Sequence, residues 1–415
     1  SIFLDDNGNV WAWGKNDYGQ LGNGFISGSN WFTAVKVESL TGITAVASGW
    51  NHNLALKDDG TVWAWGYNIN GQLGDGTKTD SPKPIQVKGL NNVIRIACNV
   101  DQSLALKADG TVWAWGDNWW GQLGDGLKDI KTTAVKIDGL TDIADIASGG
   151  EHSMALKKDG TVWCWGHNDY GQLGDNTRID SFVPVQLNIA RVVQIAGGRR
   201  HSLALKEDGT VWTWGGVKKP SIPSQVSGLS GVIDLNASNN FSAVLTEDGT
   251  SYAFGSNNNN SQQNIGNMTE LADIGLGYLH SLALKKDGSI WAVGYNNTGQ
   301  LGNGNNNNQT DPVKALLDFT DITPPEWSEG SQLTADNPTY NSVALSWSPA
   351  AEDTLAYKIF KNDTATAMVN AKTTTYNVTG LEDDTEYTFR VEARDASGNY
   401  SSNGPSTTVA TVPGP

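Results

Sequence analysis

The sequence has few cysteines and no long apolar run. Its two cysteines, Cys98 and Cys164, are too few for a disulfide framework, and both are expected to be small buried thiols. No apolar stretch approaches the ~20 residues that a helix needs to cross a bilayer. A disulfide-stapled scaffold and a helical membrane span are therefore excluded.

Positive charge is also scarce. Lys and Arg number 28 against 44 Asp and Glu, which gives a formal net charge of −16. A non-specific nucleic-acid binder needs a basic face to displace counterions, and anionic lipid attracts basic segments. The composition therefore argues against nucleic-acid and lipid partners. One local basic patch, Arg199–Arg200 with Lys218–Lys219, is expected to be solvated.

The sequence lacks the motifs of common catalytic and metal sites. It has no Gly-x-Ser-x-Gly, no phosphate-binding loop and no metal-ligand histidine cluster. Four of its five histidines, His52, His152, His201 and His280, occupy one slot of a repeat and are expected to fix turns, whereas His167 is a lone loop residue. The loops with Asp and Asn at short spacing lack the ligand order of a calcium loop. We therefore predict no enzyme, no catalytic residue, no cofactor and no metal site.

What the chain does contain is a repeat. A Trp-rich hexapeptide such as TVWAWG (111–116) follows an Asp-Gly or Asn-Gly pair in each unit, and short alternating segments on either side predict four strands per unit. Nothing shows a sustained period of 3.6 residues. Seven such units predict an all-β, seven-bladed β-propeller. The glycines that mark the units are Gly8, Gly60, Gly110, Gly160, Gly209, Gly249 and Gly288.

The repeated tryptophans have a structural interpretation. Trp113 and Trp115 are two residues apart and so share one face of a strand, where they are expected to fill the wedge between blades. Burying one indole gains roughly 4–6 kcal/mol before ordering costs. Eleven tryptophans occupy these slots: 11, 13, 63, 65, 113, 115, 163, 165, 212, 214 and 291.

The segment IASGGEHSMALKKDGTVWCWGHNDYGQLGD (146–175) resembles the regulator of chromosome condensation repeat family. The markers are a small-residue run, His-Ser, Asp-Gly, Trp-x-Trp-Gly and Gly-Gln-Leu-Gly, and they recur along residues 1–322. The resemblance implies a seven-bladed propeller. The unit opened by Ser1 lacks its own first strand, so either residues upstream supply that strand or the ring closes irregularly.

The pattern changes at DITPPEW (321–327), where a Pro-Pro pair predicts a stiff linker. Residues 323–412 resemble bacterial fibronectin type III domains, which implies a C-terminal β-sandwich with Trp347 in its core and Tyr387 as the tyrosine-corner residue. Such modules serve as spacers in secreted proteins. The resemblance therefore implies an extracellular or bacterial cell-surface location, and the tail TVPGP suggests further domains of a larger parent chain.

Several aromatic residues depart from the repeat, and topology predicts that they share one face. The turn before His-Ser and the loop carrying Gly-Gln-Leu-Gly both emerge on the same side of the disc, opposite the Asp-Gly hairpins. Trp and Tyr are enriched in binding hot spots. The predicted binding residues are Trp31, Trp50, Trp119, Trp120, Tyr18, Tyr170 and Tyr278.

The leading hypothesis is an extracellular bacterial binding or adhesion protein that recognises a protein partner through this loop face, with the fibronectin domain as spacer. The resemblance allows it, because propellers of this repeat type include β-lactamase inhibitors. The alternative is a carbohydrate-binding module that stacks sugars of a cell-surface glycan on tryptophans. The family also includes a nucleotide-exchange factor, which the acidic charge disfavours, and a plant ultraviolet receptor, whose clustered turn tryptophans are matched here only by Trp50.

Overall fold

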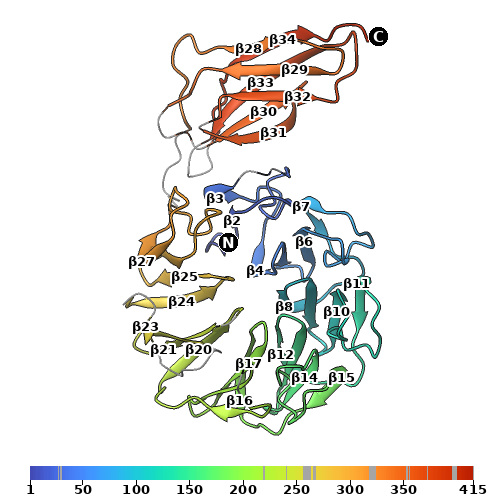
Figure 1. The fold of residues 1–415 in the computed structure, drawn as a ribbon, viewed down its shortest axis with the longest axis vertical. Coiled ribbons are helices and arrows are strands. Elements are labelled where there is room, and N and C mark those ends of the chain that lie inside the picture. The colour runs from blue at the N-terminus through green and yellow to red at the C-terminus, as the bar shows by residue number, and fades with distance from the viewer. Residues whose placement is uncertain are drawn as a thin grey trace.

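The computed structural model describes residues 1–415 except 27, 29, 218–219, 240, 256–262, 265–267, 317–323, 352–353, 355, 372, 395–399 and 415. Every regular element in this described part is a β-strand. Seven small sheets form a ring and two further sheets form a sandwich beside it (Figure 1). The predicted all-β propeller with a C-terminal sandwich is confirmed. The predicted boundary between residues 322 and 323 lies outside the described residues.

Each blade is one antiparallel sheet whose strands follow in chain order. Blades 1 to 4 comprise β1 (Ile2–Leu4), β2 (Val10–Gly14) and β3 (Trp31–Lys36); β4 (Ile43–Ser48), β5 (His52–Lys57), β6 (Val62–Gly66) and β7 (Ser81–Gln86); β8 (Val93–Asn99), β9 (Gln102–Lys107), β10 (Val112–Gly116) and β11 (Lys131–Lys136); and β12 (Ile143–Ser148), β13 (His152–Lys157), β14 (Val162–Gly166) and β15 (Ser181–Gln186). Blades 5 to 7 comprise β16 (Val192–Gly197), β17 (His201–Lys206), β18 (Val211–Gly215) and β19 (Ser224–Gln225); β20 (Val232–Ala237), β21 (Phe241–Thr246), β22 (Ser251–Gly255) and β23 (Gln263–Asn264); and β24 (Leu271–Leu276), β25 (His280–Lys285), β26 (Ile290–Gly294) and β27 (Gln309–Lys314).

Blade 1 differs from the others because its sheet has three strands, β1-β2-β3, and no described strand lies inside β1. Side chains join it to blade 7. The Trp13 indole N–H donates to the Gln300 carbonyl at 2.8 Å, and the Ser1 hydroxyl lies 2.9 Å from His280 Nε2. The ring is therefore closed between the first and seventh blades by side-chain contacts.

The second tryptophan of each hexapeptide explains why Gly-Gln-Leu-Gly recurs with it. Trp65, Trp115, Trp165 and Trp214 are completely buried. The indole N–H of Trp115 donates to the Gln72 carbonyl of the preceding blade at 2.9 Å, and the other three repeat this contact. The first tryptophan of the hexapeptide is only half-buried in most blades, because it lies nearer the Asp-Gly hairpin at the blade's edge. The predicted wedge between blades is therefore filled mainly by the second tryptophan.

The histidine slot also joins neighbouring blades. His52 Nε2 lies 3.0 Å from the Ser103 hydroxyl, and His152 and His201 make the same contact with Ser202 and Ser242. Burial lowers the pKa of His52 and of His152 to about 3, so both rings are neutral at physiological pH. The sequence predicts that these histidines fix turns, and the structure shows that they also act as clasps between neighbouring blades.

The C-terminal domain is a sandwich of a three-stranded and a four-stranded sheet, as predicted. The sheets are β28 (Leu333–Asp336), β29 (Ser342–Trp347) and β32 (Thr375–Thr379), against β31 (Thr364–Asn370), β30 (Ala356–Lys361), β33 (Glu386–Arg394) and β34 (Ser406–Ala410). Trp347 lies in the core, and the Tyr387 hydroxyl accepts the Glu382 backbone N–H at 3.0 Å. Both residues have the packing roles that the sequence predicts.

The sandwich is docked on blade 1. Met368 of β31 belongs to one buried cluster with Leu21 and Val35 of the propeller. Arg394 is only 2% exposed, and its guanidinium lies 3.4 Å from the Ala34 carbonyl of β3. A cavity of about 320 Å³ remains at this junction. The domain called a spacer in the sequence hypothesis therefore shares a buried interface with the propeller.

Candidate functional site

The strand register places both kinds of connection on one face of the disc. His152 at the start of β13 pairs with Gly166 at the end of β14, so the turn before β13 and the loop after β14 leave the blade side by side. His52 pairs with Gly66 in the same way. We call this side the loop face. The Asp-Gly hairpins lie at the opposite ends of the same strands.

The loop that follows the third strand of a blade is held rigidly. In blade 4 the Asn168 amide donates to Asp175 and to Ile179, and its oxygen accepts the Leu173 N–H at 3.0 Å. The Gln172 side chain accepts the Tyr170 N–H at 2.9 Å. Asn68, Asn118 and Asn296 repeat the Asn pattern in blades 2, 3 and 7. Side chains at the tips of these loops are therefore presented on a fixed frame.

Three blades contribute to an aromatic and basic cluster at the centre of the loop face. Trp50 precedes β5 and Tyr278 precedes β25, and their rings meet edge to face at 5.6 Å. Arg199 precedes β17, and its guanidinium lies 5.2 Å from the centre of the Trp50 ring. Trp50 is 45% exposed and Tyr278 is 46% exposed. Trp50 of blade 2 and Tyr278 of blade 7 therefore meet on the loop face across blade 1.

A second group lies beside it, where blades 3, 4 and 5 adjoin. Trp120 stacks on the His167 ring at 4.3 Å, and Tyr170 meets that ring edge-on at 6.4 Å. The Arg200 guanidinium covers Tyr170 at 4.3 Å. Glu151 Oε2 lies 3.1 Å from His167 Nδ1. Five side chains from three blades therefore form one connected group.

The remaining predicted residues have different positions. Trp119 is the most exposed tryptophan, with 68% of its surface accessible, and it stands at the tip of its loop. Tyr18 is half-buried and stacks on Tyr67 at 4.6 Å, away from the central cluster. Trp31 is predicted to be a binding residue of the loop face, and that prediction is wrong because the side chain is buried. It is the first residue of β3, only 5% exposed, and it packs in the core between blades 1 and 2.

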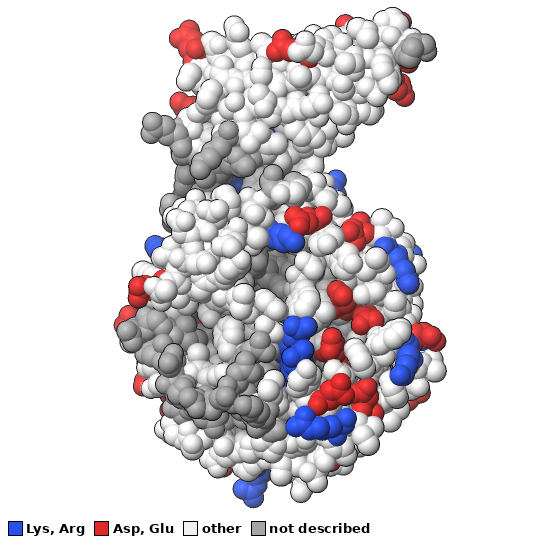
Figure 2. All heavy atoms as spheres, in the orientation of Figure 1, with Lys and Arg blue, Asp and Glu red and all other residues white. Residues whose placement is uncertain are grey.

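Carboxylates surround the aromatic groups. Burial raises the pKa of Asp101 and of Asp117, although amide groups donate hydrogen bonds to both. His167 lowers the pKa of Glu151 through a hydrogen bond. Figure 2 shows acidic and basic side chains intermixed over the half of the disc that carries β6 to β15. The site is therefore electrostatically mixed rather than uniformly acidic.

Sequence reasoning missed four members of the site: Glu151, His167, Arg199 and Arg200. From the sequence, His167 is expected to be a lone loop residue and the arginine pair a solvated patch, whereas both arginines cover aromatic rings. Their positions in the sequence could have identified these four residues, because they stand in the same kinds of turn and loop as the predicted aromatic residues. Lys218–Lys219, the other half of the predicted patch, lie outside the described residues.

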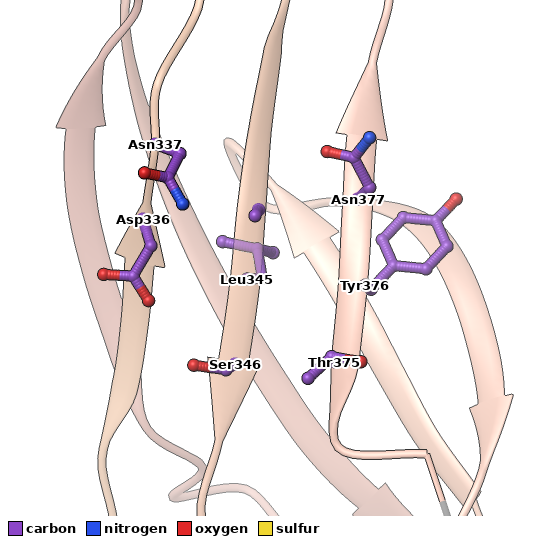
Figure 3. A pocket seen from close by; sticks show the side chains of 8 residues that line it. Asp336, Asn337, Leu345, Ser346, Thr375, Tyr376 and Asn377 are labelled. Atoms are coloured by element: carbon purple, nitrogen blue, oxygen red, sulfur yellow. The ribbon is translucent and has the colours of Figure 1, made fainter.

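A separate hollow of about 510 Å³ lies on the sandwich, across β28, β29 and β32 (Figure 3). Its side chains, among them Asp336, Ser346 and Thr375, lie along three neighbouring strands and do not converge on one point. It is far from the aromatic groups and offers a single charged residue, so we do not place the site there. Among the described residues, no helix is long and apolar enough to span a membrane.

Comparison with known proteins agrees with this architecture. The RCC1-like domain family matches residues 1–270, and regulator of chromosome condensation (RCC1) repeats match 272–300 and 287–323. The fibronectin type III domain matches 324–409. Protein RCC2 homolog of Xenopus laevis is 46% identical over 90 residues, which are 21% of this chain and 17% of that protein. The matched stretch is thus about a sixth of that relative.

Two solved structures share the fold. Yeast RCC1 (Prp20), solved bound to Kap60, superposes with a TM-score of 0.66 at 21% identity, covering 74% of this chain and 83% of its own. Human WBSCR16 also superposes with a TM-score of 0.66, at 22% identity, and the match covers 77% of this chain and 95% of the WBSCR16 chain. The chain belongs to the RCC1-like domain family and carries a fibronectin type III domain after its propeller.

Proposed function

We propose that this chain is a binding protein whose loop face docks a protein partner. The observation that carries the proposal is the exposed cluster of Trp50, Tyr278 and Arg199, contributed by three blades at the centre of that face. Tryptophan, tyrosine and arginine dominate binding hot spots, which lie near the centre of an interface. Trp119, more exposed still, stands on the adjoining loop and enlarges the apolar area.

The rigidity of the loops supports the same conclusion. Side-chain hydrogen bonds hold the loops of blades 2, 3, 4 and 7 in place before any partner arrives, so binding there orders few groups and loses little entropy. The mixed charges beside the cluster, with Arg200 close to Glu151 and Glu151 close to Asp117, provide a polar rim that can select among partners. Propellers of related fold support the idea, since yeast RCC1 was solved in complex with another protein, Kap60.

We further propose that the chain is not an enzyme and that it acts outside the cell. In the part of the site that the structure describes, stacked rings and paired charges are present, and no nucleophile, base and oxyanion donors are arranged together. The extracellular setting and a bacterial source rest on the fibronectin type III domain alone.

The test compares two matched triple variants on the whole chain. Trp50→Ala, Trp119→Ala and Trp120→Ala remove the loop-face indoles. Ile94→Ala, Val193→Ala and Ile233→Ala remove apolar side chains of similar exposure at the opposite ends of the blades. Affinity capture from cell-surface extracts, followed by titration of each purified candidate, should identify a protein that binds the second variant as tightly as the wild type and the first variant at least tenfold more weakly.

Two outcomes would overturn the proposal. Equal loss in both variants would show that the loop face has no special role. Binding that appears only on glycan arrays, and that depends on Trp119, would favour the carbohydrate alternative.

A further inference from the structure

We propose that His167, Asp169 and Asp180 form a binding site for a divalent transition-metal ion, with Zn²⁺ as the reference ion. The three residues lie in and beside the loop between β14 and β15, and one ligand atom from each lies within 4.8 Å of the others. Imidazole nitrogen and carboxylate oxygen are ligands that Zn²⁺ accepts, and three protein ligands leave a fourth position open. The inference does not depend on the loop face binding a protein.

The Nε2 atom of His167 is available to an ion. His167 is only 6% exposed, and its Nε2 makes no hydrogen bond in the described structure. The nearest charged atom is Asp169 Oδ2 at 3.2 Å, an ion-pair contact that a bound ion would replace. Zinc–nitrogen and zinc–oxygen bonds are about 2.0–2.2 Å long. Because Asp169 is exposed, its side chain can rotate to meet an ion placed on Nε2.

The other nitrogen is held in the way that metal-binding histidines require. Glu151 Oε2 lies 3.1 Å from Nδ1, so Nδ1–H donates to the carboxylate and the lone pair remains on Nε2. The Gln172 amide also approaches Nδ1, at 3.4 Å, but the shorter charged contact decides the tautomer. Trp120 stacks on the ring and fixes its plane. Orientation of the ligand by a second carboxylate and by packing is the usual support of a metal site.

The repeat provides an internal comparison. Asp180 Oδ1 accepts the Asn168 N–H at 2.8 Å, and Asp80 and Asn308 make this same contact in blades 2 and 7. This hydrogen bond therefore belongs to the framework of the repeat, and an Asn side chain can accept it as well as an Asp side chain can. In blade 2 the three positions read Tyr67, Ile69 and Asp80, and in blade 7 they read Tyr295, Asn297 and Asn308. Of the loops that keep the Asn and Gly-Gln-Leu-Gly pattern, only that of blade 4 has three ligands.

These natural replacements supply variants that should fold. Asp180→Asn copies blade 7 and keeps the scaffold hydrogen bond while removing a charged ligand. His167→Tyr copies blades 2 and 7 at the ligand position. Asp80→Asn makes the same chemical change as Asp180→Asn in a loop without the site, and so serves as the matched control. Thermal unfolding with EDTA establishes that each variant is folded.

Isothermal titration with Zn²⁺ on the EDTA-treated whole chain should show one tight site. Asp180→Asn and His167→Tyr should weaken it at least tenfold, and Glu151→Gln by about 10–100-fold, whereas Asp80→Asn should leave it unchanged. Cobalt(II) absorption gives a second readout, because a site with one nitrogen and carboxylate ligands has a visible spectrum that the variants should lose.

Absence of a stoichiometric site, or equal affinity in wild type and Asp180→Asn, would overturn the proposal. In that case the contacts of His167 with Glu151 and Asp169 serve only to hold the loop. Binding of Ca²⁺ in preference to Zn²⁺ would also contradict it, because Ca²⁺ takes oxygen ligands and would not need the imidazole.

Discussion

At the scale of single residues, exposure divides tryptophans that the sequence groups together. Trp31 and Trp50 both break the repeat, yet the first is 5% exposed and the second 45% exposed. Trp31 is the first residue of β3, and its side chain enters the wedge between blades. Trp50 instead lies in the turn between β4 and β5. Position within a blade therefore decides whether an indole stabilises the fold or remains available to a partner.

Replacing these two residues by alanine should give opposite results. Trp31→Ala removes a buried indole and leaves a cavity, so the free energy of unfolding should fall by about 3–5 kcal/mol. Trp50→Ala removes only ring contacts with Tyr278 and Arg199, and the loss should be about 1 kcal/mol. Urea denaturation measures both. A large loss for Trp50→Ala would mean that the central cluster is core.

The clasp histidines make a prediction about acid. The folded pKa of His152 is about 3, against 6.5 when it is free, because burial disfavours the charged ring. Unfolding between these values takes up a proton, so stability is fully present above pH 6.5 and falls as the pH drops toward 3, by about 1.4 kcal/mol per pH unit for each such histidine.

His152→Gln tests this, because Gln102 occupies the same slot in blade 3. The slope of unfolding free energy against pH, measured between pH 4 and 6, should decrease by about one proton in the variant. An unchanged slope, or a His152 imidazole resonance that titrates near pH 6.5, would contradict the lowered pKa of the buried His152.

At the scale of elements, the loop after the third strand combines the scaffold and the site. Gly-Gln-Leu-Gly brings the Gln carbonyl to the tryptophan of the next blade, and its last glycine lies against the same indole. A Cβ on Gly124, whose φ is +72°, would lie 2.6 Å from Trp165 Nε1. The glycine is therefore needed both for its backbone angle and for the approach of the ring.

Two glycine substitutions separate these requirements. Gly139 also has a positive φ, +80°, but a Cβ there meets nothing within 4 Å. Gly139→Ala should cost about 1–2 kcal/mol from backbone strain alone. Gly124→Ala should cost at least about 2 kcal/mol more, because the buried Trp165 must move and lose its hydrogen bond. Chemical denaturation of both variants gives the difference, and equal losses would show that the ring adapts.

Much at this scale could be predicted from the sequence. Seven units, the strand pattern and the common side of the two connections all follow from the repeat, because identical local sequence folds identically. The arginines over Trp50 and Tyr170 could not be predicted, since each contact joins two different blades. Glu151 and His167 belong to one blade, but they stand on two separate connections that local sequence does not pair. Trp31 was misplaced because the long connection before it hides where β3 begins.

At the scale of the whole molecule, the two domains are joined by a buried interface. Arg394 reaches the Ala34 carbonyl of β3, and Met368 shares a core cluster with blade 1. A buried arginine is costly unless hydrogen bonds and nearby groups compensate its charge, and the Ala34 carbonyl is one such acceptor. The interface therefore fixes the direction of the sandwich relative to the disc.

Met368→Glu should release this arrangement. Burying a carboxylate in an apolar cluster is unfavourable, so the sandwich should separate from blade 1 while each domain stays folded. Small-angle X-ray scattering should show a larger radius of gyration and a broader distribution of distances. Thr364→Glu, on the exposed start of the same strand, is the control and should scatter like the wild type. Identical curves for both variants would show that Met368 does not hold the domains together.

The docked sandwich also determines how the molecule can be approached. The disc is seen face-on in Figure 1, while the sandwich extends from its rim along the long axis, with the C-terminus at the far end. The loop face therefore points along the shortest axis of the molecule, and a partner bound to it would approach at right angles to the long axis that carries the sandwich.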